Sequence, residues 1–137
     1  PQRSATGFDA RRLNMLLAVI EKRMGYKMIT KDVFLNIAGG FRVNDPGLDL
    51  SVIASILSSA LDIEIPKECC FAGEVGLSGE VRPASRTEAR VGEAARLGFK
   101  RIILSKYAQS AQIDRIAGIE KIYVGKVEEI VPRILKR

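Results

Sequence analysis

The sequence predicts a single α/β domain of two or three layers, in which helices pack on a mixed sheet. Segments with apolar residues at helical spacing alternate along the chain with short apolar segments typical of strands. The chain has 137 residues, of which 47% are hydrophobic, so it can bury a core without disulfides or metals. No repeat or low-complexity segment divides residues 1–137, and we therefore expect one domain.

Helix and strand signals define the expected order of elements. Residues 1–7 lack periodicity and are expected to form a loop. Asp9 can cap the first helix and Gly25 can end it, whereas Pro46 suits the first turn of the second helix. The expected elements are a helix over 9–24, a strand over 32–38, a turn at 39–40 with extended chain to 43, a helix from 46 to about 61, two strands within 73–81, a helix over 86–97, strands over 100–104 and 119–124, and a last helix from 127.

Local motifs support the second half of this order. The apolar run 69–72 leads into the two strands, which a tight glycine turn joins. Ser85 and Glu88 have the spacing of a capping box at the start of the third helix. Pro132 is expected to kink or shorten the last helix. The second helix is apolar over most of its circumference, which predicts that it packs between other elements.

The composition narrows the classes of function. Lys and Arg number 22 against 16 Asp and Glu, giving a net charge of +6, and there is no histidine. This balance favours an anionic partner such as DNA. No apolar run reaches the roughly 18 residues of a membrane span, and no signal peptide is visible, so we expect a cytoplasmic protein with no membrane partner.

The two cysteines, Cys69 and Cys70, are adjacent, and a bridge between neighbours on a strand would be strained. We interpret them as small buried hydrophobic residues in a reducing compartment. Without histidine or a C-x-x-C motif, no zinc site is expected. The chain also lacks a P-loop for ATP and a serine–histidine pair, so a serine nucleophile would need another base, for which lysine is the usual substitute.

Four strings carry a resemblance that covers nearly the whole chain: residues 1–23, 32–40, 73–83 and 93–99. They resemble the carboxy-terminal domain of the bacterial RadA (Sms) DNA-repair family, whose fold is that of the Lon proteolytic domain (ribosomal protein S5 domain 2-like). The resemblance implies a domain taken from a larger RecA-like ATPase that processes branched DNA. It further implies a hexameric ring, contact with the backbone of single-stranded or branched DNA, and ATP, magnesium and a zinc motif in upstream domains, with no cofactor in this one.

The resemblance also locates the serine–lysine dyad of the Lon-type proteases. The serine falls on Gly47 and the lysine on Glu88, so neither catalytic group is present and we expect no peptidase activity. Ser51, one turn further along the helix, is the alternative nucleophile, although a small packed residue is the favoured interpretation. Glu88 is expected to cap its helix. Asp45 and Asp49 flank Gly47 and could in principle form a carboxylate pair, although Asp45 also suits a helix cap.

Six arginines are the candidates for DNA-backbone contact. The first cluster is Arg3, Arg11 and Arg12, and the second is Arg82, Arg86 and Arg90. The alternative is ordinary surface charge, with Arg90 paired to Glu93 and Arg86 paired to Glu93 or Glu88. The basic residues at 121, 126, 133, 136 and 137 are interpreted as surface charge.

Three hypotheses therefore stand. The leading one is a non-proteolytic Lon-like module for ring assembly and DNA contact. The second is an active serine peptidase with a displaced nucleophile, and the third is an oligomerisation module without DNA binding.

Overall fold

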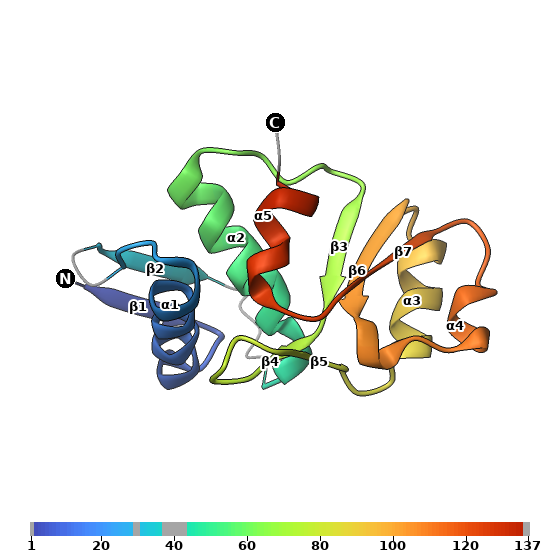
Figure 1. The fold of residues 1–137 in the computed structure, drawn as a ribbon, viewed down its shortest axis with the longest axis horizontal. Coiled ribbons are helices and arrows are strands. Elements are labelled where there is room, and N and C mark those ends of the chain that lie inside the picture. The colour runs from blue at the N-terminus through green and yellow to red at the C-terminus, as the bar shows by residue number, and fades with distance from the viewer. Residues whose placement is uncertain (1, 29–30, 37–43, 136–137) are drawn as a thin grey trace.

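The computed structural model describes residues 2–28, 31–36 and 44–135, and it confirms the α/β class. Helices and strands alternate along the chain, as Figure 1 shows. The elements are β1 (Arg3–Thr6), α1 (Ala10–Met24), β2 (Val33–Asn36), the 3₁₀ helix η2 (Pro46–Leu48), α2 (Asp49–Leu61), β3 (Cys69–Ala72), β4 (Glu74–Val75), β5 (Val81–Arg82), α3 (Thr87–Arg96), β6 (Arg101–Ser105), η3 (Lys106–Ala108), α4 (Ala111–Asp114), β7 (Glu120–Val124), η4 (Val127–Glu129) and α5 (Ile130–Arg133).

The strands divide among three sheets in the described part of the chain, where the sequence predicts one mixed sheet. β1 and β2 form a parallel pair, with Arg3 opposite Val33. β3, β6 and β7 form a parallel sheet in which β6 is central. β4 and β5 form a short antiparallel hairpin. Each parallel connection carries a helix, which is the usual way to join parallel strands.

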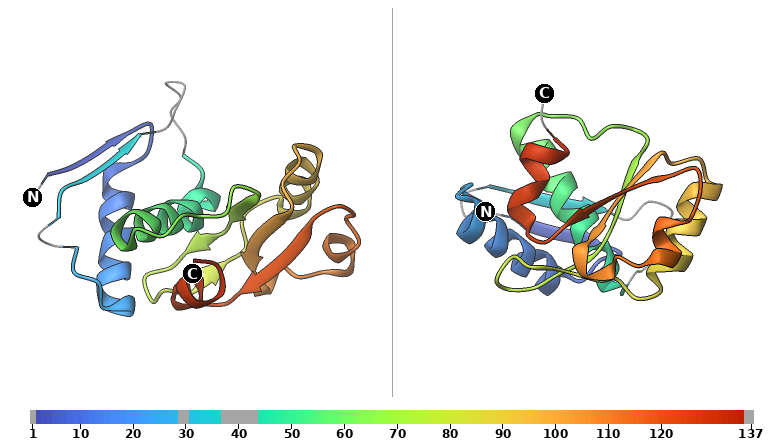
Figure 2. Two further views of the ribbon diagram at one scale, coloured as in Figure 1. Left: turned by 90° about the horizontal axis from the view of Figure 1, so that it is seen from above. Right: turned by 45° about the vertical axis from the view of Figure 1, so that its right-hand side comes forward.

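The β3–β6–β7 sheet lies between two layers of helices. Successive side chains on a strand point to opposite faces, and β6 uses both. Ile102 and Leu104 belong to a hydrophobic cluster with residues of α3 and α4, whereas Ile103 belongs to a second cluster with residues of α1, α2 and α5. The two layers are visible on either side of this sheet in Figure 2. The molecule therefore has three layers around this sheet.

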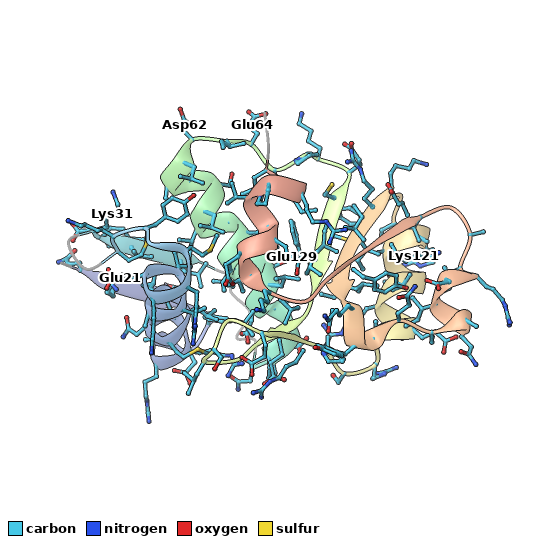
Figure 3. All side chains as sticks on the ribbon, viewed as in Figure 1. Glu21, Lys31, Asp62, Glu64, Lys121 and Glu129 are labelled. Carbon is cyan, nitrogen blue, oxygen red and sulfur yellow. The ribbon has the colours of Figure 1, made fainter. Side chains whose placement is uncertain are left out.

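The first helix forms as predicted, and the second spans the expected residues but begins with the 3₁₀ turn η2 before α2 starts at Asp49. The Asp9 side chain accepts a hydrogen bond from the Arg11 N–H at 2.8 Å, and Gly25 ends α1 in the left-handed region with φ 77°. On α2, Leu50, Ile53 and Leu57 have no exposed surface, as expected for a helix packed between elements. Asp62 ends α2 in the left-handed region, φ 54°, and lies with Glu64 on the loop at the top of the molecule in Figure 3.

The prediction of a loop over residues 1–7 is wrong, because Arg3–Thr6 form β1. The Val33 N–H donates to the Gln2 carbonyl at 2.8 Å, so pairing with a distant segment creates this strand. Its side chains alternate between half-buried and exposed, and without an apolar face it carries no periodic signal in the sequence. The expected strand is confirmed over Val33–Asn36, whereas positions 37–43 of the expected strand, turn and extended segment lie outside the described residues.

Two further expectations need correction, one is confirmed, and one helix was not predicted. The run Cys69–Ala72 is a strand in its own right, paired with β6. The capping box at Ser85 and Glu88 is wrong: the N-cap of α3 is Arg86, in the left-handed region at φ 53° and without a side-chain cap. The last helix is reduced to η4 and α5, which ends at Arg133, so the shortening expected from Pro132 is confirmed. α4 was not predicted at all.

Candidate functional site

The position expected for a nucleophilic serine lies in the short helix η2. Asp45 caps this helix by accepting a hydrogen bond from the Gly47 N–H at 2.9 Å. The Gly47 carbonyl accepts from the Gly73 N–H at 3.0 Å, which fixes η2 against the start of the β4–β5 hairpin. Gly47 is buried and carries no side chain that could attack a substrate.

Arg90 of α3 occupies the space beside Gly47. The three heavy atoms nearest to the place of a Cβ on Gly47 all belong to the Arg90 guanidinium, at 2.8, 2.9 and 2.9 Å. This guanidinium pairs with Asp45 at 2.7 Å and donates to the Ser85 carbonyl at 2.7 Å. The predicted pairing of Arg90 with Glu93 is wrong, because Glu93 pairs with Arg96.

The other residues named for this site lie on α3 and α2. Glu88 lies exposed in the first turn of α3, where its carboxylate cannot serve as the neutral amine base of a serine–lysine dyad. Arg90, the side chain that does reach Gly47, carries a guanidinium, which has five N–H donors and no hydrogen-bond acceptor. Ser51 is half-buried on α2.

Arg12 forms a partly buried ion pair that the sequence did not reveal. Its Nε donates to Asp49 at 2.6 Å, and its Nη2 pairs with the second oxygen of the same carboxylate. Asp49 has no exposed surface and also accepts a hydrogen bond from the Val75 N–H at 3.0 Å. Hydrogen bonding to Asp49 raises the pKa of the Arg12 guanidinium above its ordinary value. The pair thus joins α1, α2 and β4.

The structure places one arginine of each predicted cluster, Arg12 and Arg82, at the β4–β5 hairpin. Nη2 of Arg12 lies 3.7 Å from Oε1 of Glu74, and Glu74 is opposite Arg82 in the register of the hairpin. Arg82 in turn pairs with Glu80 at 2.7 Å. Carboxylates therefore alternate with the arginines across this surface, which lowers the positive potential that an anionic partner would meet.

The six arginine candidates differ in how far they are engaged within the domain. Arg3 donates to the main-chain carbonyls of Lys31, at 3.1 Å, and of Met28. Arg11 and Arg86 are exposed, and within the described residues neither side chain has a hydrogen-bond or ion-pair partner. Sequence spacing could not separate these two from the others, because the partners of Arg12 and Arg90 lie 37 and 45 residues away.

Neither a metal centre nor a membrane segment is found in the part of the chain that the structure describes. No group of three or more His, Cys, Asp or Glu side chains there could hold a metal ion. None of the described helices is both long and apolar enough to cross a bilayer. Both cysteines are free, and burial raises the pKa of the Cys70 thiol to about 11.

Comparison with known proteins assigns this α/β domain to a family. The chain belongs to the family described as "Subunit ChlI of Mg-chelatase", whose model matches residues 5–108.

Among individual proteins, it is similar to those named DNA repair protein RadA, as the resemblance in the sequence predicts. Identity is 46% over 94% of this chain for the Bacillus subtilis protein, 46% over 77% for that of Rickettsia typhi, and 38% over 99% for that of Chlamydia muridarum. The chain spans only 28%, 24% and 28% of these relatives, respectively.

Proposed function

We propose that this chain is a non-proteolytic, Lon-like domain of a RadA-type DNA repair and recombination ATPase. In this proposal the domain supports a hexameric ring and contacts the DNA backbone, while ATP, magnesium and zinc bind to domains upstream. Such a protein would act in the cytoplasm, where bacterial DNA is repaired. The similarity to proteins named DNA repair protein RadA over most of the chain supports the repair role.

The observation that supports a domain without peptidase activity is the position of the Arg90 guanidinium beside Gly47. Peptide-bond attack needs an activated hydroxyl and a base within hydrogen-bond reach. Here the position inferred for the nucleophile is a glycine, and the neighbouring space holds the Arg90 guanidinium, which is paired with Asp45. This filled position supports a domain that keeps the scaffold without the hydrolysis.

A serine-reactive fluorophosphonate probe tests this part. We expect no labelling of the wild-type chain, and none of Gly47→Ser, because a serine at 47 would still lack a base. An active serine hydrolase in the same tube is the control for the probe. Labelling of the wild-type chain that disappears in Ser51→Ala would instead establish the displaced-nucleophile peptidase.

The DNA contact is supported by the net charge of +6 and by Arg11, an exposed arginine whose side chain has no hydrogen-bond or ion-pair partner within the described residues. Phosphate contacts give affinity that falls as salt rises. Labelled duplex DNA should therefore bind weakly at about 50 mM salt and lose at least tenfold in affinity by about 200 mM.

Arg11→Glu is the variant that tests the contact, because its side chain has no structural role in the described residues. We expect it to weaken DNA binding several-fold at low salt. Arg115→Glu, at an exposed arginine that ends α4, makes the same change of charge on a helix that carries none of the six candidate arginines and is the matched control. Binding that ignores salt, or equal losses in both variants, would contradict the phosphate contact.

The assembly part is tested by light scattering of the chain and of the complete RadA-type protein. A hexamer of the complete protein that dissociates when this domain is removed is the expected result. A complete protein that forms the same ring without the domain would contradict a role in assembly. Assembly without any DNA affinity would favour the pure oligomerisation module.

A further inference from the structure

An open groove runs along the outer face of α3, and it has a volume of about 520 Å³, within the range of ligand sites. Arg86 and Arg90 line the groove at the start of α3, and Leu97 and Phe99 line it at and beyond the end of the helix. We refer to it as the α3 groove, lined by Arg86, Ala89, Arg90, Glu93, Ala94, Leu97 and Phe99. In Figure 1, α3 lies on the side of the β3–β6–β7 sheet away from α2.

The lining of the α3 groove is mainly apolar. Leu97 is 61% exposed, one of the few large hydrophobic side chains left open to solvent among the described residues. Phe99 is half-buried and packs against the hydrophobic cluster under α3, of which Ala94 is a member. An apolar lining with an open leucine gains free energy when another apolar side chain covers it.

The charge of the α3 groove is concentrated at the Arg86 end. Within the described residues no carboxylate pairs with Arg86, which is exposed and held in the left-handed region at φ 53°. The other two charges are already engaged, since Arg90 pairs with Asp45 and Glu93 pairs with Arg96. The occupant that complements this surface has a carboxylate beside large apolar side chains.

We propose that the α3 groove binds an acidic peptide segment of a protein partner, with its apolar side chains against Leu97 and Phe99 and a carboxylate at Arg86. A DNA backbone fits this groove less well, because phosphates make no favourable contact with the apolar side chains of Leu97 and Ala89. The one aromatic ring in the lining, that of Phe99, is half-buried and therefore does not offer a face on which bases could stack. This inference goes beyond the proposed function and does not depend on DNA contact.

The test uses a phage library of random peptides of about 12 residues, which is long enough to span one helix face. The library is selected on the wild-type chain after depletion on the double variant Arg86→Glu/Leu97→Ser. Enriched sequences should combine Asp or Glu with Leu, Phe or other large apolar residues. No enrichment over the depleted pool, or enriched sequences without acidic residues, would overturn the proposal.

A synthetic copy of an enriched peptide is then titrated into ¹⁵N-labelled protein. We expect shifts of the amides of residues 86–99, and about tenfold weaker binding for Arg86→Glu and for Leu97→Ser separately. Arg11→Glu, on the helix farthest from α3 in Figure 1, should leave peptide affinity unchanged. Circular dichroism checks that each variant is folded.

Duplex DNA titrated into the same sample separates this inference from the proposed function. If DNA shifts the amides of α3, displaces the peptide and loses affinity in Arg86→Glu but not in Leu97→Ser, the groove is part of a phosphate-binding surface and the peptide assignment is wrong. Peptide binding without any DNA binding would leave this inference standing and remove only the DNA contact.

Discussion

At the scale of single residues, the buried carboxylate of Asp49 makes the stability of the domain depend on its ion pair with Arg12. This carboxylate has no exposed surface and takes its counter-charge from Arg12, whose side chain is 28% exposed. A buried charge is tolerated only while it is paired and hydrogen-bonded. Arg12 is therefore needed for the fold, and an experiment that swaps its charge would test folding before it tested DNA contact.

We expect Arg12→Ala to lower the free energy of unfolding by about 3 kcal/mol, because it leaves the Asp49 carboxylate buried without its partner. Urea denaturation followed by circular dichroism measures this loss. Arg11→Ala is the matched control one residue earlier on α1, and it should change stability by less than about 0.5 kcal/mol. Equal effects of the two variants would contradict a stabilising role for the pair.

Gly47 provides room for Arg90, and the two positions should therefore be energetically coupled. A side chain at 47 meets only the flexible end of Arg90, which can move away and give up its bonds to Asp45 and Ser85. We expect Gly47→Ser and Arg90→Ala each to cost about 1 kcal/mol, and the double variant to cost no more than one of them. Additive losses in urea denaturation would show that Arg90 does not fill the space beside Gly47.

At the scale of elements, the sequence predicted those that carry their own signals. α1 has a cap, an apolar face and a terminal glycine, and each was visible before the structure. β1 and α4 were missed, since the first has no apolar face and the second is a single turn. The resemblance assigned Gly47 and Glu88 to the expected dyad positions, but it could not predict the position of Arg90, because the contact of Arg90 with Asp45 exists only after folding.

The turn from β7 into η4 depends on one carboxylate. Glu129, labelled in Figure 3, accepts hydrogen bonds from the Gly125 and Lys126 N–H groups at 2.7 and 2.9 Å and pairs with Arg133. Burial works against ionisation of Glu129, but these hydrogen bonds and Arg133 outweigh it and lower its pKa below the ordinary 4.5. The ionised form is therefore the one that stabilises the fold.

We expect Glu129→Gln to cost about 1 kcal/mol at pH 7, the usual loss for a helix cap. A pKa lowered by folding gives stability that is present above the unfolded value and disappears as pH falls through the folded value. The difference between wild type and variant should hold down to about pH 4.5 and shrink below it. Urea denaturation across this pH range measures the stability difference, and Glu128→Gln at the exposed neighbouring residue is the control. A difference that grows as the pH falls would contradict a stabilising role for the ionised Glu129 carboxylate.

At the scale of the whole molecule, two hydrophobic clusters share one sheet. β6 is the central strand, and its successive residues Ile102, Ile103 and Leu104 alternate between the two clusters. Neither cluster can lose its packing without exposing one face of β6. The domain should for this reason unfold as one unit, as small single domains usually do.

Two matched leucines test this cooperativity. Leu57 on α2 and Leu104 on β6 have no exposed surface and belong to different clusters. Leu→Ala at either position should cost about 3 kcal/mol, since each leaves a cavity in a packed core. If the clusters are coupled through the sheet, each variant lowers the urea midpoint for amide signals on both sides of β6 equally, in a single transition with unchanged slope. The contrary result would be seen in Leu57→Ala, if the amide signals of α3 and α4 persisted at urea concentrations that had removed those of α1 and α2. The two layers would then unfold separately, with β6 packed mainly on the α3 side.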